Sequence, residues 1–293
     1  MIRKRIVIAT CEQWPKPSVS LKCLGEALEK RGTEVRFAPW QTTSAFEGAD
    51  LVLPLATWDY AQDSDRFLNW LAELRRKGIT VRNSPDLIRW NLNKRYLLAL
   101  AESGVATVAT VHLKHPNADT LRQAAHKLDA DTVVIKPACG QSGNDVQRLR
   151  IDELADARIP KSSNHGVLVQ PFIASVENEG EVSVCCIEGR FAHAVRRQTA
   201  DNEWRANSRY GVNIEPFTPP SHLIKQAERL LASLPEIPLY ARVDCFFTHQ
   251  KTFILSELEL IEPALFLERY SESVEQFADA IESDASPGEP ARQ

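Results

Sequence analysis

Apolar and polar positions in the first ninety residues predict a small α/β unit. Four short apolar runs have the length of buried strands, at 5–10, 35–40, 50–55 and 80–82. Between them, apolar residues recur at spacings of three and four around Leu24 and Leu71, as on one face of a helix. This alternation favours a parallel sheet, so we expect an N-terminal parallel α/β domain over residues 1–88.

The pattern changes after this domain. A helical pattern that ends near Gly104 is followed by many strand-like runs, at 108–113, 132–137, 167–172, 182–187, 191–196, 240–247 and 253–261. A last helix is expected near 273–282. We therefore expect a second, sheet-rich domain over residues 89–282, with α/β and α+β character overall. The segment 283–293 is polar and rich in Pro and Gly, which predicts a disordered tail.

Composition excludes several classes of function. The 293 residues carry a net charge of -4, and no run of Lys and Arg is interleaved with aromatic residues, so nucleic acid is not an expected partner. We see no signal-peptide pattern and no apolar stretch long enough for a membrane span, so we expect a cytoplasmic protein with no membrane partner. The first strand is not followed by the glycine-rich turn of dinucleotide-binding folds, which argues against NAD. None of the six cysteines forms a CxxC pair, so neither a zinc site nor a disulfide framework is expected.

The strongest chemical signal lies on two neighbouring strands near the end of the chain. Arg242 and Asp244 share one face of the first strand, and Glu257 and Glu259 share one face of the second. A short connection at 248–251 predicts a hairpin, with Asp244 within a residue or two of a position opposite Glu257. Three carboxylates on one patch repel unless a cation joins them, and hard oxygen ligands favour Mg²⁺ or Mn²⁺. A solvated strand face with incidental acids is the alternative.

Two weaker signals lie upstream. Lys136 ends a β-branched strand and precedes a loop with two glycines and a serine, which is typical of a phosphate grip, although a surface bend explains the same residues. The strand at 167–172 ends in the triplet Gln170-Pro171-Phe172. Proline keeps this triplet extended, so neighbouring backbone groups can face an adenine edge; an ordinary strand end is the alternative.

The order of these features resembles the ATP-grasp superfamily over the whole chain. More narrowly, the segments 57–60, 89–97, 180–183 and 257–263 look like the glutathione-synthetase-like branch that includes D-cycloserine synthetase. The resemblance implies an ATP-grasp fold, in which a pre-ATP-grasp domain precedes two sheet-containing subdomains that grip ATP. The sequence departs from the family pattern at two places. Pro54, Leu55 and Ala56 stand where an arginine and a serine are expected, so the family's substrate cannot be assigned to this chain. The phosphate loop, residues 138–144, has fewer glycines than its relatives, which bears on the speed of its closure.

The resemblance also implies roles for individual residues. Those expected to bind the nucleotide are Lys94, Lys136, the loop residues Gly140, Ser142 and Gly143, the adenine hinge Gln170, Pro171 and Phe172, and Glu181. Asp244, Glu257 and Glu259 match the family's metal-binding motifs, with glutamate in place of asparagine at 259. Arg242 is expected to hold the transferred phosphoryl group, because a guanidinium can fork onto its oxygens. Arg205 and Asn207 belong, with Arg196, Arg197 and Arg209, to a polar segment that can hold a substrate anion, or that is simply a solvated loop.

The implied function is an ATP-dependent carboxylate–amine ligase. It would form an amide bond, within one molecule or between two, through an acyl phosphate, with release of ADP and phosphate. The expected cofactors are ATP and Mg²⁺, with Mn²⁺ as a substitute, and the expected partners are small-molecule carboxylate and amine substrates, with a homodimer allowed. Two alternatives stay open: a small-molecule kinase of the same fold, and a module that binds ATP without turning it over.

Overall fold

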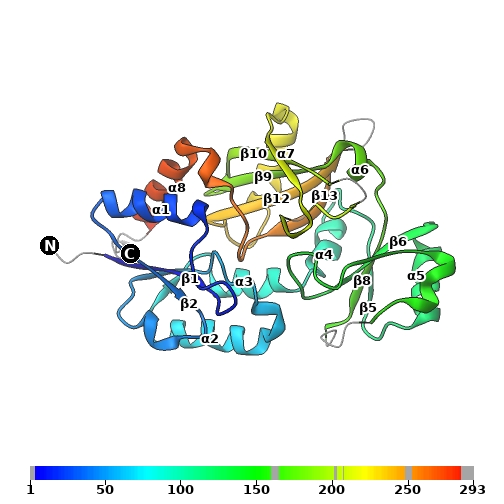
Figure 1. Cartoon of the computed structure of the whole chain (residues 1–293), viewed down its shortest axis with the longest axis horizontal. Coiled ribbons are helices and arrows are strands. Elements are labelled where there is room, and N and C mark those ends of the chain that lie inside the picture. Colours follow the sequence, from blue (N-terminus) through cyan, green and yellow to red (C-terminus); the bar gives the residue numbers. More distant parts are fainter. Residues whose placement is uncertain (1–3, 160–164, 201–202, 207, 248–252, 285–293) are drawn as a thin grey trace, which may run out of the picture.

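The N-terminal part is built on a parallel sheet of four strands in the order β2-β1-β3-β4. A computed structural model of the chain describes residues 4–159, 165–200, 203–206, 208–247 and 253–284. The strands are β1 (Arg5–Thr10), β2 (Glu34–Pro39), β3 (Leu51–Leu53) and β4 (Thr80–Val81). Helices α1 (Val19–Lys30) and α2 (Ser64–Arg76) complete this unit (Figure 1). The predicted parallel α/β domain is thereby confirmed.

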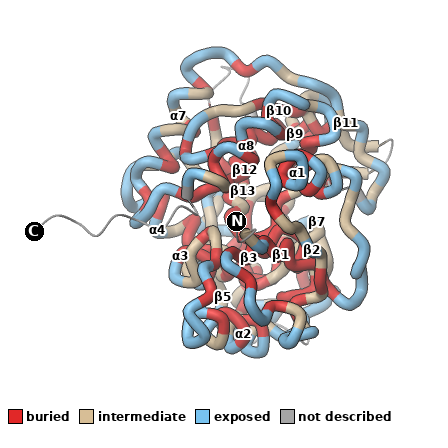
Figure 2. Tube along the Cα trace, turned by 90° about the vertical axis from the view of Figure 1, so that its left-hand side faces the viewer, coloured by how far each residue is buried: buried red, intermediate tan, exposed pale blue. Residues whose placement is uncertain are grey.

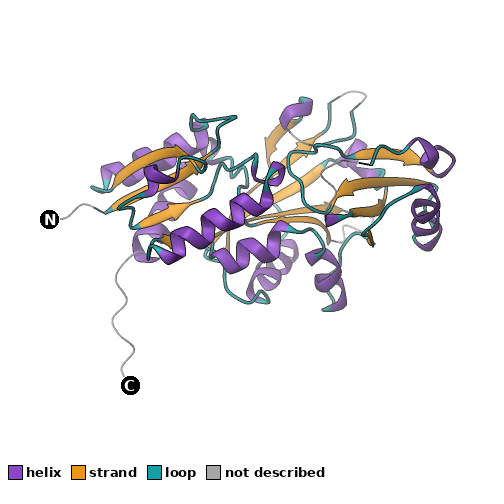
Figure 3. Cartoon of the chain, turned by 90° about the horizontal axis from the view of Figure 1, so that it is seen from below, coloured by secondary structure: helices purple, strands orange, loops and turns teal. Residues whose placement is uncertain are grey.

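The rest of the chain contains two further sheets, seen apart from the first in Figure 3. One has the order β11-β10-β9-β12-β13, and its strands are β9 (Glu181–Ile187), β10 (Arg190–Gln198), β11 (Asn213–Pro216), β12 (Tyr240–Phe247) and β13 (Phe253–Glu259). The other has the order β5-β8-β6-β7, with β5 (Val111–Leu113), β6 (Thr132–Pro137), β7 (Gln147–Arg150) and β8 (Val167–Pro171). Two sheet-containing subdomains were expected, and the fold class is confirmed.

The helices connect these layers. They are α3 (Pro85–Leu92), α4 (Tyr96–Glu102), α5 (Ala118–Lys127), α6 (Ser175–Glu179), α7 (Ser221–Ala232) and α8 (Ser271–Asp284). The predicted domain boundary at residue 88 falls inside α3. Helix α8 returns to the N-terminal domain and packs beside α1 (Figure 1). Ser283 and Asp284 belong to α8, so the predicted tail begins too early, and residues 285–293 lie outside the described part of the chain.

The buried residues form continuous cores under each sheet, as the red segments of Figure 2 show. One cluster joins Leu24 and Leu28 of α1 to Phe277 and Ile281 of α8, which ties the end of the chain to its beginning. All six cysteines are free and five of them are buried, and burial raises the pKa of the Cys139 thiol to about 11. Within the described residues, no helix is both long and apolar enough to cross a membrane.

Strand β13 lies at the edge of its sheet, and side chains from the α3–α4 region hold that edge. The Asn91 amide donates to the Leu258 carbonyl over 2.8 Å and accepts from the Leu260 backbone N–H over 3.0 Å. The Tyr96 hydroxyl donates to the Leu258 carbonyl and accepts from its N–H, both over 2.9 Å. These buried side chains bond backbone groups of β13 that would otherwise need a further strand as their partner. They therefore fix the position of β13, which carries Glu257 and Glu259.

Candidate active site

A single cavity of about 710 Å³ opens between the three sheets. Its volume lies within the usual range for small-molecule and cofactor sites, roughly 300–1,000 Å³. The predicted site residues that the structure describes all line it: Lys94, Lys136, Gly140, Ser142, Gly143, Gln170, Pro171, Phe172, Glu181, Arg205, Arg242, Asp244, Glu257 and Glu259. Asn207 lies outside the described residues. The cavity therefore collects residues from segments far apart in the sequence.

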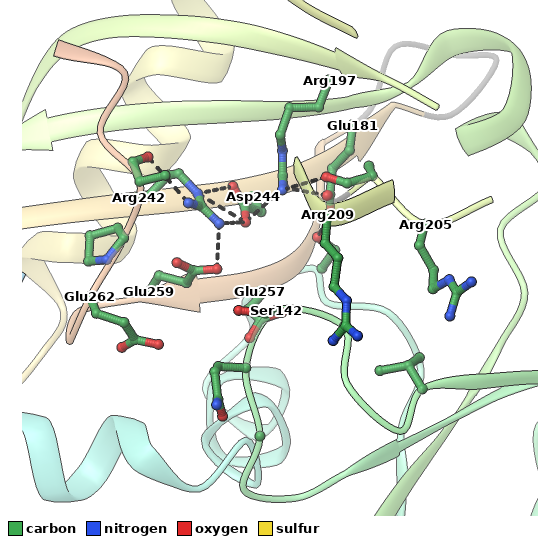
Figure 4. Close-up of a pocket in the computed structure, with 18 of the residues that line it drawn as sticks. Ser142, Glu181, Arg197, Arg205, Arg209, Arg242, Asp244, Glu257, Glu259 and Glu262 are labelled. Atoms are coloured by element: carbon green, nitrogen blue, oxygen red, sulfur yellow. Dashed lines mark hydrogen bonds and ion pairs between the residues drawn. The ribbon is translucent and has the colours of Figure 1, made fainter. Parts of the chain in front are cut away.

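The hairpin of β12 and β13 has the register that the sequence predicts. Asp244 lies opposite Glu257, and Arg242 lies opposite Glu259, with a β-bulge immediately after Asp244. The connection at 248–251 lies outside the described residues. Because side chains alternate along each strand, these four point to one face, where Figure 4 shows them together.

Asp244 is the most strongly compensated acid of the site. Arg242 Nε lies 2.9 Å from Asp244 Oδ1, and Arg197 Nη2 lies 2.9 Å from Oδ2. The Ser183 hydroxyl donates to Oδ1 over 2.7 Å. Burial opposes ionisation of this carboxyl, but the two arginines outweigh it and lower the pKa of Asp244 to about 2. Asp244 is therefore a fixed negative charge at neutral pH.

Lys94 lies between the phosphate loop and the hairpin. Its Nζ is 2.5 Å from Glu257 Oε1 and donates to the Gly140 carbonyl over 2.7 Å. Burial opposes the charge on both partners, yet their mutual attraction raises the pKa of Lys94, and Lys94 with Lys136 lowers the pKa of Glu257. The resemblance assigns Lys94 to the nucleotide; in the structure its direct partners are Gly140 and Glu257.

Two further acids, Glu259 and Glu262, line the same cavity. Glu259 is ion-paired with Arg242, but burial, reinforced by Asp244 and Glu257, raises the pKa of Glu259 to about 7. Glu262 also lines the cavity and is only 8% exposed. Burial and the neighbouring Glu259 raise its pKa well above the ordinary value. Sequence reasoning gave Glu262 no role, although its position three residues after Glu259 in an apolar segment was a usable signal.

Lys136 lies on the facing wall, at the end of β6. It is buried, and burial lowers the pKa of its ammonium group. In the described part of the chain its side chain makes no ion pair or hydrogen bond, which suits a residue that receives an anionic ligand. In the loop that follows, Ser142 and Gly143 have φ values of 57° and 67°, so successive amide groups can curve around a phosphate.

The phosphate loop is tied to both sides of the cavity. Gln141 Nε2 donates to the Trp58 carbonyl over 2.7 Å, which links the loop to the N-terminal domain. On the opposite side, Arg209 Nη1 donates to Asn144 Oδ1 over 2.6 Å. The loop is thus held in place by hydrogen bonds at both ends.

The predicted adenine hinge lies on the last residues of β8 and just beyond. Gln170 Nε2 donates to the Thr110 hydroxyl over 2.8 Å, and the Phe172 N–H donates to the Thr132 carbonyl over 3.0 Å. The guanidinium of Arg148 lies 3.8 Å from the centre of the Phe172 ring. This arrangement gives the hinge a flat, partly cationic wall that suits stacking with an aromatic base.

Arg197, within β10, and Arg205, after it, have different surroundings. Arg205 is held by Glu203 at 2.8 Å and stacks on Tyr210 with its guanidinium 3.7 Å from the ring centre. Figure 4 places Arg205 away from the hairpin acids. Arg197, which sequence reasoning named only as part of this polar segment, is instead buried at the centre, paired with both Glu181 and Asp244. The signal was the strand register, which sets Arg197 opposite Glu181.

The donor set fits magnesium in kind, but not as one preformed cluster. Asp244, Glu257 and Glu259 offer hard oxygen atoms to the same cavity, as Mg²⁺ requires. Within the described residues, however, no three His, Cys, Asp or Glu side chains are grouped closely enough to hold a metal ion. The physical reason is that arginine and Lys94 already neutralise these acids. A metal ion at Oε1 of Glu257 would compete with Lys94 for that oxygen.

The sheet order, the glycine-bearing loop and the charged hairpin define an ATP-grasp protein. The chain belongs to the ATP-grasp superfamily, a family of ATP-dependent ligases. Residues 6–83 match the N-terminal domain of D-cycloserine synthetase DcsG, and residues 100–236 match the ATP-grasp domain of prokaryotic glutathione synthetase.

Individual relatives agree with this assignment. The cycloserine biosynthesis protein DcsG of Streptomyces lavendulae is 26% identical, over 89% of this chain and 92% of its own length. The crystal structure of D-cycloserine synthetase DcsG superposes with a TM-score of 0.82 at 22% identity, covering 96% of this chain and all of that one. The D-alanine–D-alanine ligase of Bacillus anthracis complexed with ATP has a TM-score of 0.67 at 17% identity, covering 96% and 97% of the two chains, and it shows the shared fold.

Proposed function

We propose that this protein is an ATP-dependent carboxylate–amine ligase that works through an acyl phosphate. The observation that carries the proposal is the pair of facing walls in one cavity. Lys136 and the glycine-bearing loop form one wall, and the hairpin with Arg242, Asp244 and Glu257 forms the other. A site that only bound adenine would need neither wall, since both carry the charges that terminal phosphates require.

The nucleotide would lie across both subdomains. The segment Gln170, Pro171 and Phe172 receives the adenine edge, and the buried Lys136 with the loop amides receives phosphate oxygens. Glu181 is bonded to Arg197 and Ser256 and lines the same cavity, where it would contact the nucleotide or order the hinge. Magnesium held by Asp244, Glu257 and Glu259 would supply charge neutralisation on the phosphates.

The chemical steps require no protein nucleophile. A carboxylate oxygen of the substrate attacks the γ-phosphorus of ATP, the bond to the β-phosphate oxygen breaks, and ADP leaves with an acyl phosphate in place. An amine then attacks the acyl carbon, and phosphate leaves as the amide forms. Arg242 would hold the transferred phosphoryl oxygens; it lines the cavity, and Asp244 fixes the plane of its guanidinium. Arg197 fixes Asp244 from the other side.

The test is ADP release by the full chain with Mg²⁺ and ATP, screened against a panel of carboxylates and amines. Turnover that needs both a carboxylate and an amine supports the proposal, and hydroxylamine should replace the amine and yield a hydroxamate. A stable phosphorylated product formed without any amine would identify a small-molecule kinase instead. ATP binding without ADP release across the panel would identify a non-catalytic module.

A further inference from the structure

We propose that the end of the cavity formed by Glu262, Trp58 and Trp14 is the subsite for the amine substrate, which it takes as a primary ammonium group on an apolar body. This inference rests on the proposed ligase function and adds a substrate class to it. Figure 4 places Glu262 beside Glu259, at the end of the site away from Arg205 and Arg209.

Glu262 is an acid of this cavity on which a cation, Lys94, acts only at longer range than an ion pair. Among the described residues, Asp244 and Glu259 are ion-paired with Arg242, and Glu257 is ion-paired with Lys94. Glu262 has no ion pair within that same part of the chain, and its carboxylate accepts a hydrogen bond from its own backbone N–H. Burial disfavours the ionised form of this carboxyl group, and a ligand cation beside it would favour that form.

An aromatic side chain contacts the backbone of Glu262, and a second one packs against the first. Trp58 Nε1 donates to the Glu262 carbonyl over 3.1 Å, so the indole lies against the backbone of the acidic residue. The ring of Trp14 packs edge-on against Trp58, with ring centroids 6.2 Å apart. Trp14 is 44% exposed and Val19 is 63% exposed, and both line the cavity. An acid flanked by aromatic rings is a favourable environment for an organic cation with a hydrocarbon body.

The positive charge that bears on Glu262 among the described residues is already used. That charge is Lys94, which is ion-paired with Glu257 and donates to the Gly140 carbonyl over 2.7 Å. Leu55, which also lines the cavity, is apolar. The site therefore favours an amine without a neighbouring carboxylate over an α-amino acid.

Trp58 also connects the subsite to the phosphate loop. Its carbonyl accepts the hydrogen bond from Gln141, while its indole contacts the Glu262 backbone. Arg242 bonds the Ala264 carbonyl in the segment that follows Glu262. An amine held by Glu262 is thereby placed beside the groups that would hold the acyl phosphate, which is where the second step needs it.

The experiment measures binding of benzylamine, and of its uncharged analogue benzyl alcohol, to the full chain in the presence of Mg²⁺ and ADP. Isothermal titration calorimetry gives both dissociation constants. The wild type should bind benzylamine more tightly than benzyl alcohol. Glu262→Gln should weaken benzylamine about tenfold or more while leaving benzyl alcohol unchanged. The matched control Glu268→Gln removes another cavity-lining acid and should leave both constants unchanged.

A second variant separates the apolar contribution from the charge. Trp14→Ala should weaken benzylamine several-fold and leave methylamine unchanged, because only the ring of benzylamine reaches the indole. Equal binding of benzylamine by wild type and Glu262→Gln would overturn the proposal. Failure of the wild type to bind benzylamine, or a change in Mn²⁺ affinity of Glu262→Gln with benzylamine affinity intact, would overturn it as well.

Failure of the subsite and failure of the ligase function give different results. Carboxylate-dependent ADP release trapped by hydroxylamine tests the acyl phosphate in wild type and needs no ammonium site. If that reaction occurs and benzylamine binding does not depend on Glu262, only the subsite is wrong. If no carboxylate gives ADP or hydroxamate, the ligase function itself is wrong.

Discussion

Lys94 Nζ lies 2.5 Å from Glu257 Oε1, inside the cavity that both residues line. Lys94 stands in the short segment between α3 and α4, and Glu257 stands on β13, so the pair joins the entry of the second domain to the β12–β13 hairpin. The ammonium group of Lys94 therefore occupies one of the two oxygens of Glu257. We expect a divalent ion to compete with Lys94 for that oxygen.

Replacing Lys94 should reveal this competition. Lys94→Met leaves the buried Glu257 uncompensated, so its affinity for a divalent ion should rise by about tenfold. Binding of Mn²⁺ without nucleotide, followed by electron paramagnetic resonance, measures the effect. ATP turnover should fall in the same variant, and Lys77→Met, which removes an exposed partner of Glu73, serves as the control. Unchanged or weaker Mn²⁺ binding in Lys94→Met would refute the competition.

A second variant, Glu257→Gln, tests whether Glu257 belongs to the metal site. The variant keeps the shape of the side chain but removes the charge that faces Asp244, so it should remain folded and lose ADP formation by about a hundredfold or more. Circular dichroism checks the fold, and a coupled ADP assay measures turnover. Wild-type turnover in this variant would remove Glu257 from the metal site.

The edge of β13 should depend strongly on Asn91. Asn91→Ala leaves the buried Leu260 N–H without its partner and leaves the Leu258 carbonyl only the Tyr96 hydroxyl as a side-chain donor, so the free energy of unfolding should fall by about 1–3 kcal/mol. Urea unfolding measures this quantity. The exposed Asn213→Ala is the matched control and should change it by less than about 0.5 kcal/mol. A loss as small as that of the control would show that other groups hold the strand.

His193 should make stability depend on pH. Its ring is buried between the Ser273 hydroxyl at 2.8 Å and the Leu265 carbonyl at 2.7 Å, and burial lowers the pKa of this histidine below its ordinary value of 6.5. The unfolded chain then binds a proton that the folded chain excludes. The contribution is therefore fully present above pH 6.5 and is lost as the pH falls below it.

The loss approaches about 1.4 kcal/mol per pH unit for one proton. In His193→Gln this dependence should flatten between pH 6.5 and 5, whereas the exposed His222→Gln should keep it. Thermal melts across this range measure both variants. An unaltered slope in His193→Gln would assign the pH dependence to other groups.

Most strands were predictable from the sequence, because apolar runs with the right period mark them. β1, β6 and β12 have the expected bounds. Helix α5 was missed because much of its buried face consists of alanines, which give a weak apolar signal. Helix α7 was missed although its buried residues, Leu223, Ala227, Leu230 and Leu231, recur at helical spacings. β7 was missed for a different reason: its sequence is mostly polar, and it forms a strand because it pairs with β6.

The site residues also fall into two groups: those that local sequence patterns predict and those whose place depends on tertiary packing. Arg242, Asp244, Glu257 and Glu259 were found because local alternation and a short turn bring them together. Arg197 was missed as a central residue because its place depends on tertiary packing of β10 beside β9 and on the burial of Asp244. The pairing of Lys94 with Glu257 could not be predicted either, because it depends on how a loop from another segment meets the hairpin.

The central claim is that a carboxylate is activated by direct transfer of the γ-phosphoryl group. The most direct test supplies the carboxylate substrate found in the ADP screen with both oxygens labelled with ¹⁸O, together with its amine, ATP and Mg²⁺, and measures the phosphate released by mass spectrometry. An acyl phosphate predicts that each phosphate carries one ¹⁸O atom from the carboxylate. Phosphate that contains no ¹⁸O while amide forms would contradict the account.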